Sequence, residues 1–309
     1  MSPEILTNHI ALTRKCKLTI ISLVLLLVAA CCGTPLAAGS GPWQPLQLLQ
    51  PSRESGQTPR PLNLAIDRER QRYYLIDGAN AMITAFDNGG TELSRFNADG
   101  AFVHPVAMVR DSSDNLWISD RGLNSLLHLS LKNRQMERYT LTRPGQAMVI
   151  PDRLAIDQQN NIYCLDLFSG EILKYQPDLS LDAVFALPAG GRGFMDLKLK
   201  GDRLWALDGT AKTASVFALD GTREQTISLP TSLQFAIALE VDQAGALYLL
   251  DRHAGTIVVC DRSGRLRYRF MSKGELPGQL AYGAQLLFDW QGNLVVADEG
   301  NGRIEIFGR

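Results

Sequence analysis

A motif that recurs six times constrains the fold of this 309-residue chain more than any other feature. Each copy is a hydrophobic run that ends in aspartate: RYYLID at Asp77, NLWISD at Asp120, NIYCLD at Asp166, RLWALD at Asp208, ALYLLD at Asp251 and NLVVAD at Asp298. Successive aspartates lie 43, 46, 42, 43 and 47 residues apart. A unit of this length fits one four-stranded propeller blade and is too long for a leucine-rich or ankyrin repeat. The repeat therefore predicts an all-β, six-bladed β-propeller.

The sequence inside each repeat predicts four antiparallel strands. A second hydrophobic run precedes most copies of the motif, and a short polar turn such as SSDN or QQNN separates the two runs, as in a hairpin. Third and fourth strands follow, the fourth read from segments such as TELSRF and RLRYRF. No stretch combines a helical period with helix caps. A column of mostly aromatic side chains stands three residues before the aspartates and suits packing between blades: Tyr74, Trp117, Tyr163, Trp205, Tyr248 and Val295.

The last repeat lacks a strand, and this gap predicts how the ring closes. After Asp298 the chain supplies only RIEIFG and then stops. The segment WQPLQLLQ at residues 43–50 has the apolar content of a strand. We expect it to complete the sixth blade, burying Leu46, Leu48 or Leu49 and removing an exposed strand edge.

The N-terminus differs from the rest of the chain. Basic residues at positions 14, 15 and 17 precede an uncharged run over residues 18–30, which is typical of a secretory signal. The run ends in Val-Ala-Ala-Cys, which resembles the lipobox of bacterial lipoproteins and makes Cys31 the expected lipidation site. This pattern predicts a signal peptide over residues 1–30, a linker over 31–42 and a propeller over 43–309.

The same leader predicts where the protein resides. We expect an exported protein that is lipid-anchored at the cell envelope, at the outer membrane or in the periplasm, because Cys32 rather than aspartate follows Cys31. Two alternatives remain open: cleavage after Ala38, giving a soluble periplasmic protein, or an uncleaved anchor.

The positions of the cysteines bear on disulfide formation, and the net charge bears on possible partners. Cys164 and Cys260 fall within predicted strands of different repeats, so we expect two buried thiols rather than a disulfide. The 31 basic and 32 acidic residues give a net charge of -1. Nucleic acid is therefore not an expected partner.

The resemblance to a known family is carried by the segment at residues 274–289, GELPGQLAYGAQLLFD. It resembles the loop of NHL-repeat propellers that leads into the innermost strand of the next blade, and the proline before that strand recurs as Pro61, Pro105 and Pro151. The resemblance implies a six-bladed propeller whose ligand binds at the mouth of the central channel. It leaves the activity open, because related propellers include binding platforms, lyases and lactonases.

Candidate ligand-binding residues lie at a position where the six repeats carry different residue types. Two residues after the Pro61-type position stand Asn63, Ala107, Arg153, Met195, Ala238 and Gln285, and His104 and Asp196 lie in the same crossovers. Asn63, Arg153, Asp196, Gln285 and His104 are the candidates, and an anionic or polyhydroxyl ligand would suit Arg153. Alternatively, Arg153 pairs with Asp152 or Asp196 and plugs the channel. We interpret the Asp77-type carboxylates as turn residues rather than as a cation site.

Histidine is scarce, which weakens hypotheses of metal catalysis. The chain has four histidines, and no clear glutamate accompanies Asn63 and Asp196 in the pattern of a lactonase. We therefore expect no metal and no cofactor, and a non-catalytic binding or scaffold propeller whose partner is an envelope protein or a saccharide. The alternative is a metal-dependent, lactonase-like hydrolase or lyase that uses Asn63, Arg153, Asp196 and Gln285.

One predicted outermost strand alternates Arg265, Arg267 and Arg269 with apolar residues. We interpret this row as a solvated edge that resists aggregation, with contact to an anionic surface as the alternative.

Overall fold

The computed structural model describes residues 42–52, 57–133, 135–146 and 148–309. The predicted signal peptide, most of the linker and the lipidation site at Cys31 lie outside the described residues. Among the helices of the described part, none has the length and apolar character needed to cross a membrane.

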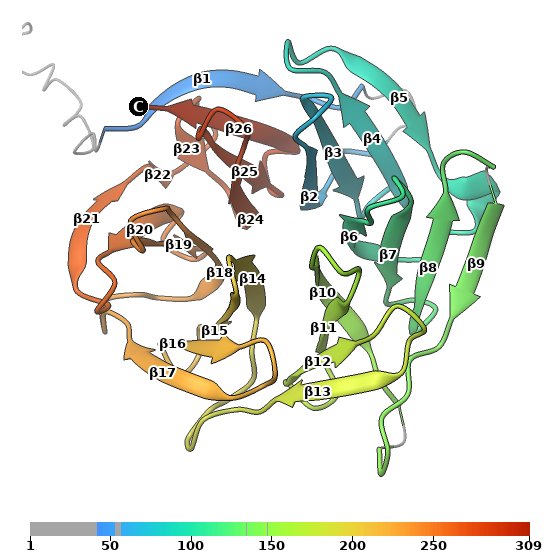
Figure 1. The fold of residues 1–309 in the computed structure, drawn as a ribbon. Helices are drawn as coiled ribbons and strands as arrows, with labels where there is room; N and C mark the ends of the chain where they lie inside the picture. Colours follow the sequence, from blue (N-terminus) through green and yellow to red (C-terminus); the bar gives the residue numbers. More distant parts are fainter. Residues whose placement is uncertain (1–41, 53–56, 134, 147) are drawn as a thin grey trace, which may run out of the picture. The chain divides into compact units, whose positions relative to one another are not determined.

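Six four-stranded antiparallel sheets form a ring, which confirms the predicted propeller (Figure 1). Blade 1 contains β2 (Pro61–Asp67), β3 (Arg72–Asp77), β4 (Met82–Phe86) and β5 (Glu92–Phe96); blade 2 contains β6 (Pro105–Arg110), β7 (Leu116–Asp120), β8 (Ser125–Ser130) and β9 (Gln135–Tyr139); blade 3 contains β10 (Pro151–Ile156), β11 (Ile162–Asp166), β12 (Ile172–Tyr175) and β13 (Leu181–Phe185). Blade 4 contains β14 (Asp196–Lys200), β15 (Arg203–Asp208), β16 (Thr213–Ala218) and β17 (Arg223–Ser228); blade 5 contains β18 (Ala236–Val241), β19 (Leu247–Asp251), β20 (Thr256–Cys260) and β21 (Leu266–Phe270); blade 6 contains β24 (Gly283–Phe288), β25 (Leu294–Asp298), β26 (Arg303–Gly308) and β1 (Gln44–Leu49). A 3-10 turn, Ala98–Gly100, lies between blades 1 and 2, and the short parallel pair β22 (Ser272–Lys273) and β23 (Gln279–Leu280) lies between blades 5 and 6.

The antiparallel order gives the ring two distinct faces. The innermost strand of each blade starts after the crossover from the previous blade and runs to its hairpin with the second strand. We call the side with the crossovers and the second-to-third-strand turns the crossover face, and the opposite side the hairpin face. The Asp77-type residues end the second strands and therefore lie at the crossover face.

The N-terminal strand closes the ring as predicted. β1 pairs with β26, from Gln44 opposite Gly308 to Leu49 opposite Ile304. The register shifts between Pro45 and Gln47, and of the three leucines only Leu49 is buried. The expected burial of one of these leucines is confirmed at Leu49, whereas Leu46 is 62% and Leu48 37% exposed.

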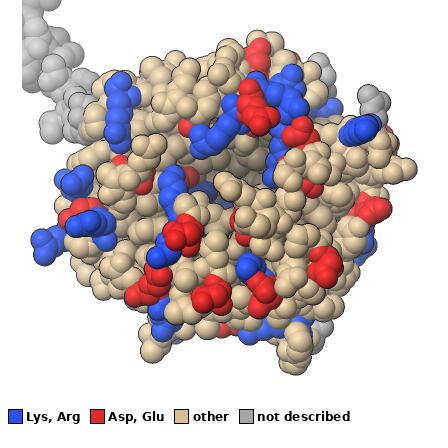
Figure 2. Space-filling model, in the orientation of Figure 1, with Lys and Arg blue, Asp and Glu red and all other residues tan. Residues whose placement is uncertain are grey.

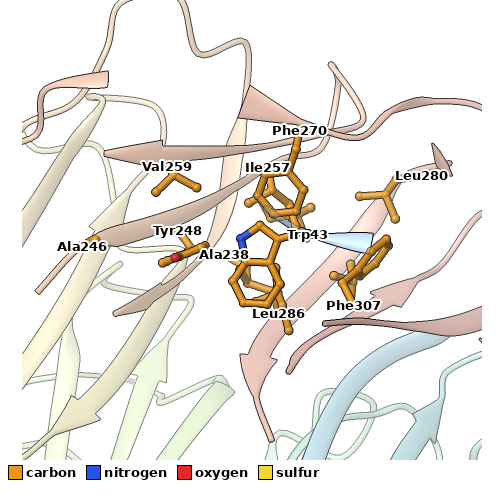
Figure 3. Close-up of a cluster of buried hydrophobic side chains, with 13 residues drawn as sticks. Trp43, Ala238, Ala246, Tyr248, Ile257, Val259, Phe270, Leu280, Leu286 and Phe307 are labelled. Carbon is orange, nitrogen blue, oxygen red and sulfur yellow. The ribbon is translucent and has the colours of Figure 1, made fainter. Parts of the chain in front are cut away.

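Trp43 supplies the other apolar anchor of the closing strand. Its indole stacks on Phe270 at 6.0 Å between ring centroids and meets the edge of Tyr248 at 5.9 Å (Figure 3). It belongs to one cluster with Phe307 and Leu286, so it joins blades 5 and 6. Truncation of a large buried aromatic side chain typically costs about 3–5 kcal/mol.

The two cysteines inside the propeller are buried free thiols, as predicted. Cys164 lies in β11 and Cys260 in β20, each among the apolar side chains between neighbouring blades. Burial raises the pKa of Cys260 to about 11. Both thiols are therefore protonated and serve as small core residues.

The six motif aspartates pin turns, as expected from their sequence. All six side chains are buried: Asp77, Asp120, Asp166, Asp208, Asp251 and Asp298. Asp77 Oδ1 accepts from the backbone N–H of Arg60 at 2.9 Å and from that of Ala79 at 3.0 Å, so one carboxylate fixes both the incoming crossover and the adjacent turn. Asp251 accepts from the backbone N–H groups of Gln234 and Phe235 in the incoming crossover and from that of Ala254 in the adjacent turn. These carboxylates hold the crossover face together.

The arginine row lies on the outer edge of blade 5. Arg267 and Arg269 are exposed on β21, the outermost strand of that blade, and Arg269 donates to the hydroxyl of Ser232. Leu266 is also exposed, so the alternation is incomplete. This arrangement agrees with a solvated strand edge.

Candidate functional site at the channel mouth

The innermost strands place one residue per blade at the same level of the channel. In five blades, the residue at this level pairs with the residue just before the motif aspartate on the second strand. These five residues are Asn63, Ala107, Asp196, Ala238 and Gln285. In blade 3, Arg153 lies in the bulge at the corresponding position. The sequence alignment assigned this level to Met195 in blade 4. β14 pairs with β15 in continuous register from Asp196 opposite Leu207, so Asp196 takes the position instead.

Four of the five candidates line a single cavity. Asn63, Arg153, Asp196 and Gln285 surround a channel of about 320 Å³. His104 lies apart from that group, at a second pocket of about 270 Å³ on the crossover face. Arg153 lines both spaces and therefore separates the mouth pocket from the channel.

Three of the channel residues link neighbouring blades. The Asn63 Oδ1 atom accepts from the backbone N–H of Met108 at 3.2 Å, and Asp196 Oδ2 accepts from Leu239 N–H at 2.9 Å. The Gln285 Oε1 atom accepts from the backbone N–H of Leu64. Each bond reaches the inner strand of the next blade. These side chains therefore satisfy buried backbone groups where the strand ladders cannot.

Arg153 crosses the channel without a carboxylate partner among the described residues. Its Nη1 donates to Leu62 O at 3.3 Å and its Nη2 to Ala284 O at 3.2 Å, so blade 3 is tied to blades 1 and 6. Asp152 instead accepts from Arg121 Nε at 2.8 Å. Arg153 does cross the channel, as in the alternative prediction, but neutral carbonyl oxygens rather than Asp152 or Asp196 hold its guanidinium. Its positive charge remains uncompensated by direct pairing.

Asp196 is the one acidic residue at this level of the channel. Burial raises its pKa, while the charges of Lys198 and Arg153 and the Leu239 N–H lower it, and the net result is a pKa above the ordinary value. Lys198 Nζ lies 3.8 Å from Asp196 Oδ2. A buried carboxylate with two cations nearby is a structural charge rather than a free ligand for a metal.

The mouth pocket is rich in arginine. Its charged and imidazole side chains are Arg60, Arg121, Arg153, Arg252, His104 and Glu299. Figure 2 shows the ring hollowed at its centre, with charged side chains around the rim. Four guanidinium groups thus meet one lining carboxylate, and Asp152 beneath Arg121 supplies a second.

Buried acids hold these arginines in place. Glu299 accepts from Arg60 Nε at 3.0 Å and from Arg252 Nη2 at 2.6 Å. Burial alone would raise the pKa of Glu299, but the bonds from the two arginines outweigh it and lower the pKa. Glu299 is therefore ionised at neutral pH. After it and Asp152 are counted, an excess of positive charge remains at the mouth.

Three of these arginines were missing from the sequence-based candidates. Arg121 and Arg252 directly follow the motif aspartates Asp120 and Asp251, and Arg60 directly precedes Pro61. Glu299 follows Asp298 in the same way. The residue after the motif aspartate could therefore have indicated the pocket from sequence, because Arg121, Arg252 and Glu299 all hold that position and line the mouth.

No group of three or more His, Cys, Asp or Glu side chains among the described residues could hold a metal ion. The two remaining described histidines pack on aromatic rings. His128 stacks on Trp117 at 4.3 Å, and His253 stacks on Phe235 at 4.9 Å. These imidazoles have packing roles.

The sequence matches no protein-family model and no curated protein. Solved structures do resemble the fold. A streptogramin B lyase superposes with a TM-score of 0.64 at 15% identity, covering 87% of this chain and 99% of the other. A catalytically inactive virginiamycin B lyase from Staphylococcus aureus, solved with quinupristin, gives 0.62 at 16% identity, with 86% and 88% covered. A gluconolactonase from Xanthomonas campestris gives 0.64 at 14% identity, with 88% and 96% covered.

These similarities establish the six-bladed propeller fold. The identities are too low to transfer an activity.

Proposed function

We propose that this protein is a binding propeller of the cell envelope that takes a small anionic ligand at its channel mouth. The observation that carries the proposal is the set of four arginines around one pocket on the crossover face. Guanidinium groups bind carboxylate and phosphate oxygens with paired, directional hydrogen bonds.

The arginines are held ready for such a ligand. Arg121 and Arg153 are fixed by bonds to Asp152 and to backbone carbonyls, so little side-chain freedom is lost when an anion binds. The pocket of about 270 Å³ holds roughly nine water volumes. A dicarboxylate, a tricarboxylate or a sugar phosphate is of suitable size.

The experiment measures binding of citrate, succinate and glucose 6-phosphate by calorimetry, with glucose as the neutral comparison. Arg153→Met should weaken binding of the best anion at least tenfold, because it removes the charge at the floor of the pocket. Arg265→Ala removes an exposed arginine of the outer edge of blade 5 and should leave the affinity unchanged. Equal affinities of wild type and Arg153→Met would refute the mouth as the binding site.

The cellular address is a separate part of the proposal. The leader sequence supports export as a lipoprotein with Cys31 acylated, and the segment at residues 274–289 supports an NHL-type propeller. The partner in this proposal is an envelope protein or a saccharide. Labelling of cells with a palmitate analogue should mark the wild-type protein and fail to mark Cys31→Ser. Labelling that persists in Cys31→Ser would move the anchor to Cys32, and its complete lack in wild type would favour plain secretion.

A metal-dependent hydrolase or lyase is the second candidate function. It is supported by the convergence of Asn63, Arg153, Asp196 and Gln285 on one cavity and by the lyases and gluconolactonase among the structural neighbours. Calorimetric titration with Ca²⁺ and Zn²⁺ tests it. Tight binding that Asn63→Ala abolishes would favour the enzyme, and no binding of either ion would exclude this form of it.

A further inference from the structure

A second groove, of about 650 Å³, lies on the hairpin face, opposite the mouth pocket. It is formed by the first hairpin turns of blades 4, 5, 6 and 1 together with the C-terminal residue. Its ring and cationic side chains are Trp290, Phe288, Arg68, Lys200 and Arg309. The proposed function of the mouth makes no use of this groove.

Trp290 stands in a turn that does not require tryptophan. Asp289 Oδ1 accepts from the backbone N–H groups of Gln291 at 2.8 Å and Asn293 at 2.9 Å, which fixes the turn. The residues after the corresponding aspartates of other blades are polar or charged: Arg68, Ser112, Gln158 and Gln243. The indole is half-buried and rests against Tyr73 at 4.7 Å between ring centroids.

The indole N–H of Trp290 has no hydrogen-bond partner among the described residues, although the nitrogen is buried. Because this nitrogen is buried, the indole ring rather than its N–H is the part of Trp290 that a ligand in the groove can contact.

Three cations line the groove together with the rings of Trp290 and Phe288. Arg68 donates to Phe288 O and to Asp289 O, both at 3.0 Å, which holds its guanidinium at the groove. Lys200 Nζ lies 5.9 Å from the centre of the Phe288 ring. Arg309 donates to the Tyr248 hydroxyl at 2.6 Å. Lys200 Nζ also lies 3.4 Å from a Glu240 carboxylate oxygen, and Arg309 Nη2 lies 3.9 Å from Asp242 Oδ2. Among the described residues, Arg68 is therefore the one of the three cations without a carboxylate at ion-pair distance.

The remaining polar lining is amide. Gln243, Gln291 and Asn293 reach the groove from two neighbouring turns. Amide side chains both donate and accept, which suits sugar hydroxyl groups, while an indole face suits the C–H face of a sugar ring. Cations beside such a surface favour sugars that carry carboxylate groups.

We propose that the hairpin-face groove binds an acidic saccharide chain, with Trp290 as the stacking platform and Arg68, flanked by Lys200, as the carboxylate contact. The site is independent of the channel mouth, because the two share no lining residue. A saccharide chain bound here would leave the mouth open to its own ligand.

The experiment titrates the whole protein with a hexamer of galacturonic acid and with maltohexaose, a neutral chain of equal length. Binding is followed by calorimetry and by tryptophan fluorescence. The acidic chain should bind at least tenfold more tightly than the neutral one. Trp290→Ala should weaken it at least tenfold, and Lys200→Met about threefold with a smaller dependence on salt.

Matched variants keep the test decisive. Trp290→Phe retains a ring against Tyr73 and should keep most of the affinity even if Trp290→Ala unfolds. Arg267→Ala removes an exposed arginine from the outer edge of blade 5 and should have no effect. Equal binding of the acidic and neutral chains, or wild-type affinity in folded Trp290→Ala, would overturn the proposal.

Discussion

Blade 6, where the two ends of the propeller meet, and the channel mouth, where the inner strands converge, are held together by different forces. At the seam between β1 and β26, Trp43 and Leu49 are buried among side chains of neighbouring strands. At the mouth, Arg60, Arg121 and Arg252 are held by buried carboxylates. Apolar burial stabilises the first region, and charged hydrogen bonds organise the second.

The difference separates stability from binding. Burial of a large aromatic side chain contributes several kcal/mol, whereas partly exposed ion pairs contribute about 0–1 kcal/mol each. The arginines at the mouth therefore add little to the stability of the ring. We expect them to contribute to ligand binding through the positive charge that they place around the pocket. Substitutions in the two regions should consequently separate the two properties.

The largest effect is expected at the seam. Trp43→Ala should lower the free energy of unfolding by about 3–5 kcal/mol, because it leaves a cavity between blades 5 and 6. Thermal melting followed by circular dichroism measures the loss. Affinity for the mouth anion should stay within twofold of wild type in the folded variant.

Leu46→Ala is the matched control in the same strand. Leu46 is 62% exposed, so its truncation should change stability by less than about 0.5 kcal/mol. If both variants were destabilised equally, the seam would depend on strand pairing rather than on burial of Trp43.

The seam was largely predictable from sequence, and its details were not. Counting motif aspartates gave the blade number, and the missing strand after Asp298 identified its replacement. The sequence left Leu46, Leu48 and Leu49 as alternatives, because a register shift between Pro45 and Gln47 decides which side chains face inward. A bulge depends on the partner strand, so alternation alone does not locate it.

A buried charge in the same seam has the next largest expected effect. Glu305 of β26 is fully buried, accepts from Gly278 N–H at 2.9 Å and pairs with Arg303. Burial raises its pKa from 4.5 to about 7, despite the lowering by Gly278 and Arg303. The folded state therefore binds this proton more tightly than the unfolded state, and stability falls as the pH rises from 4.5 to 7.

Glu305→Gln keeps an acceptor for Gly278 N–H and removes the titration. At pH 8 it should be about 1–3 kcal/mol more stable than wild type, and at pH 4 the two should be nearly equal. Urea unfolding at several pH values measures this difference. Glu69→Gln changes an exposed carboxyl and serves as the control. An unchanged pH profile in Glu305→Gln would show that Glu305 is not the group responsible.

The mouth was only partly predictable. Asn63, Arg153 and Gln285 were found because they break the agreement among repeats at a fixed position. Asp196 needed the register of β14 to replace Met195 at that level. The remaining arginines were missed because they flank positions whose structural role was already explained by the turn. Trp290 was missed for the same reason, since its turn was interpreted only as hairpin punctuation.

The smallest effect is expected at the rim of the mouth. The Arg60 side chain is 58% exposed and shares Glu299 with Arg252, so solvent screens its charge more than that of Arg153. Arg60→Ala should weaken the mouth anion only two- to threefold, about 0.5 kcal/mol, and leave thermal stability within error. Titration of the anion at 50 and 200 mM salt measures both the loss and its screening.

Binding of the galacturonate hexamer on the opposite face provides the internal control and should not change. A loss as large as that in Arg153→Met would mean that the rim, rather than the arginine across the channel, carries the affinity. The contrast between these two arginines therefore tests whether anion recognition depends on preorganised charge or only on the number of cations around the pocket.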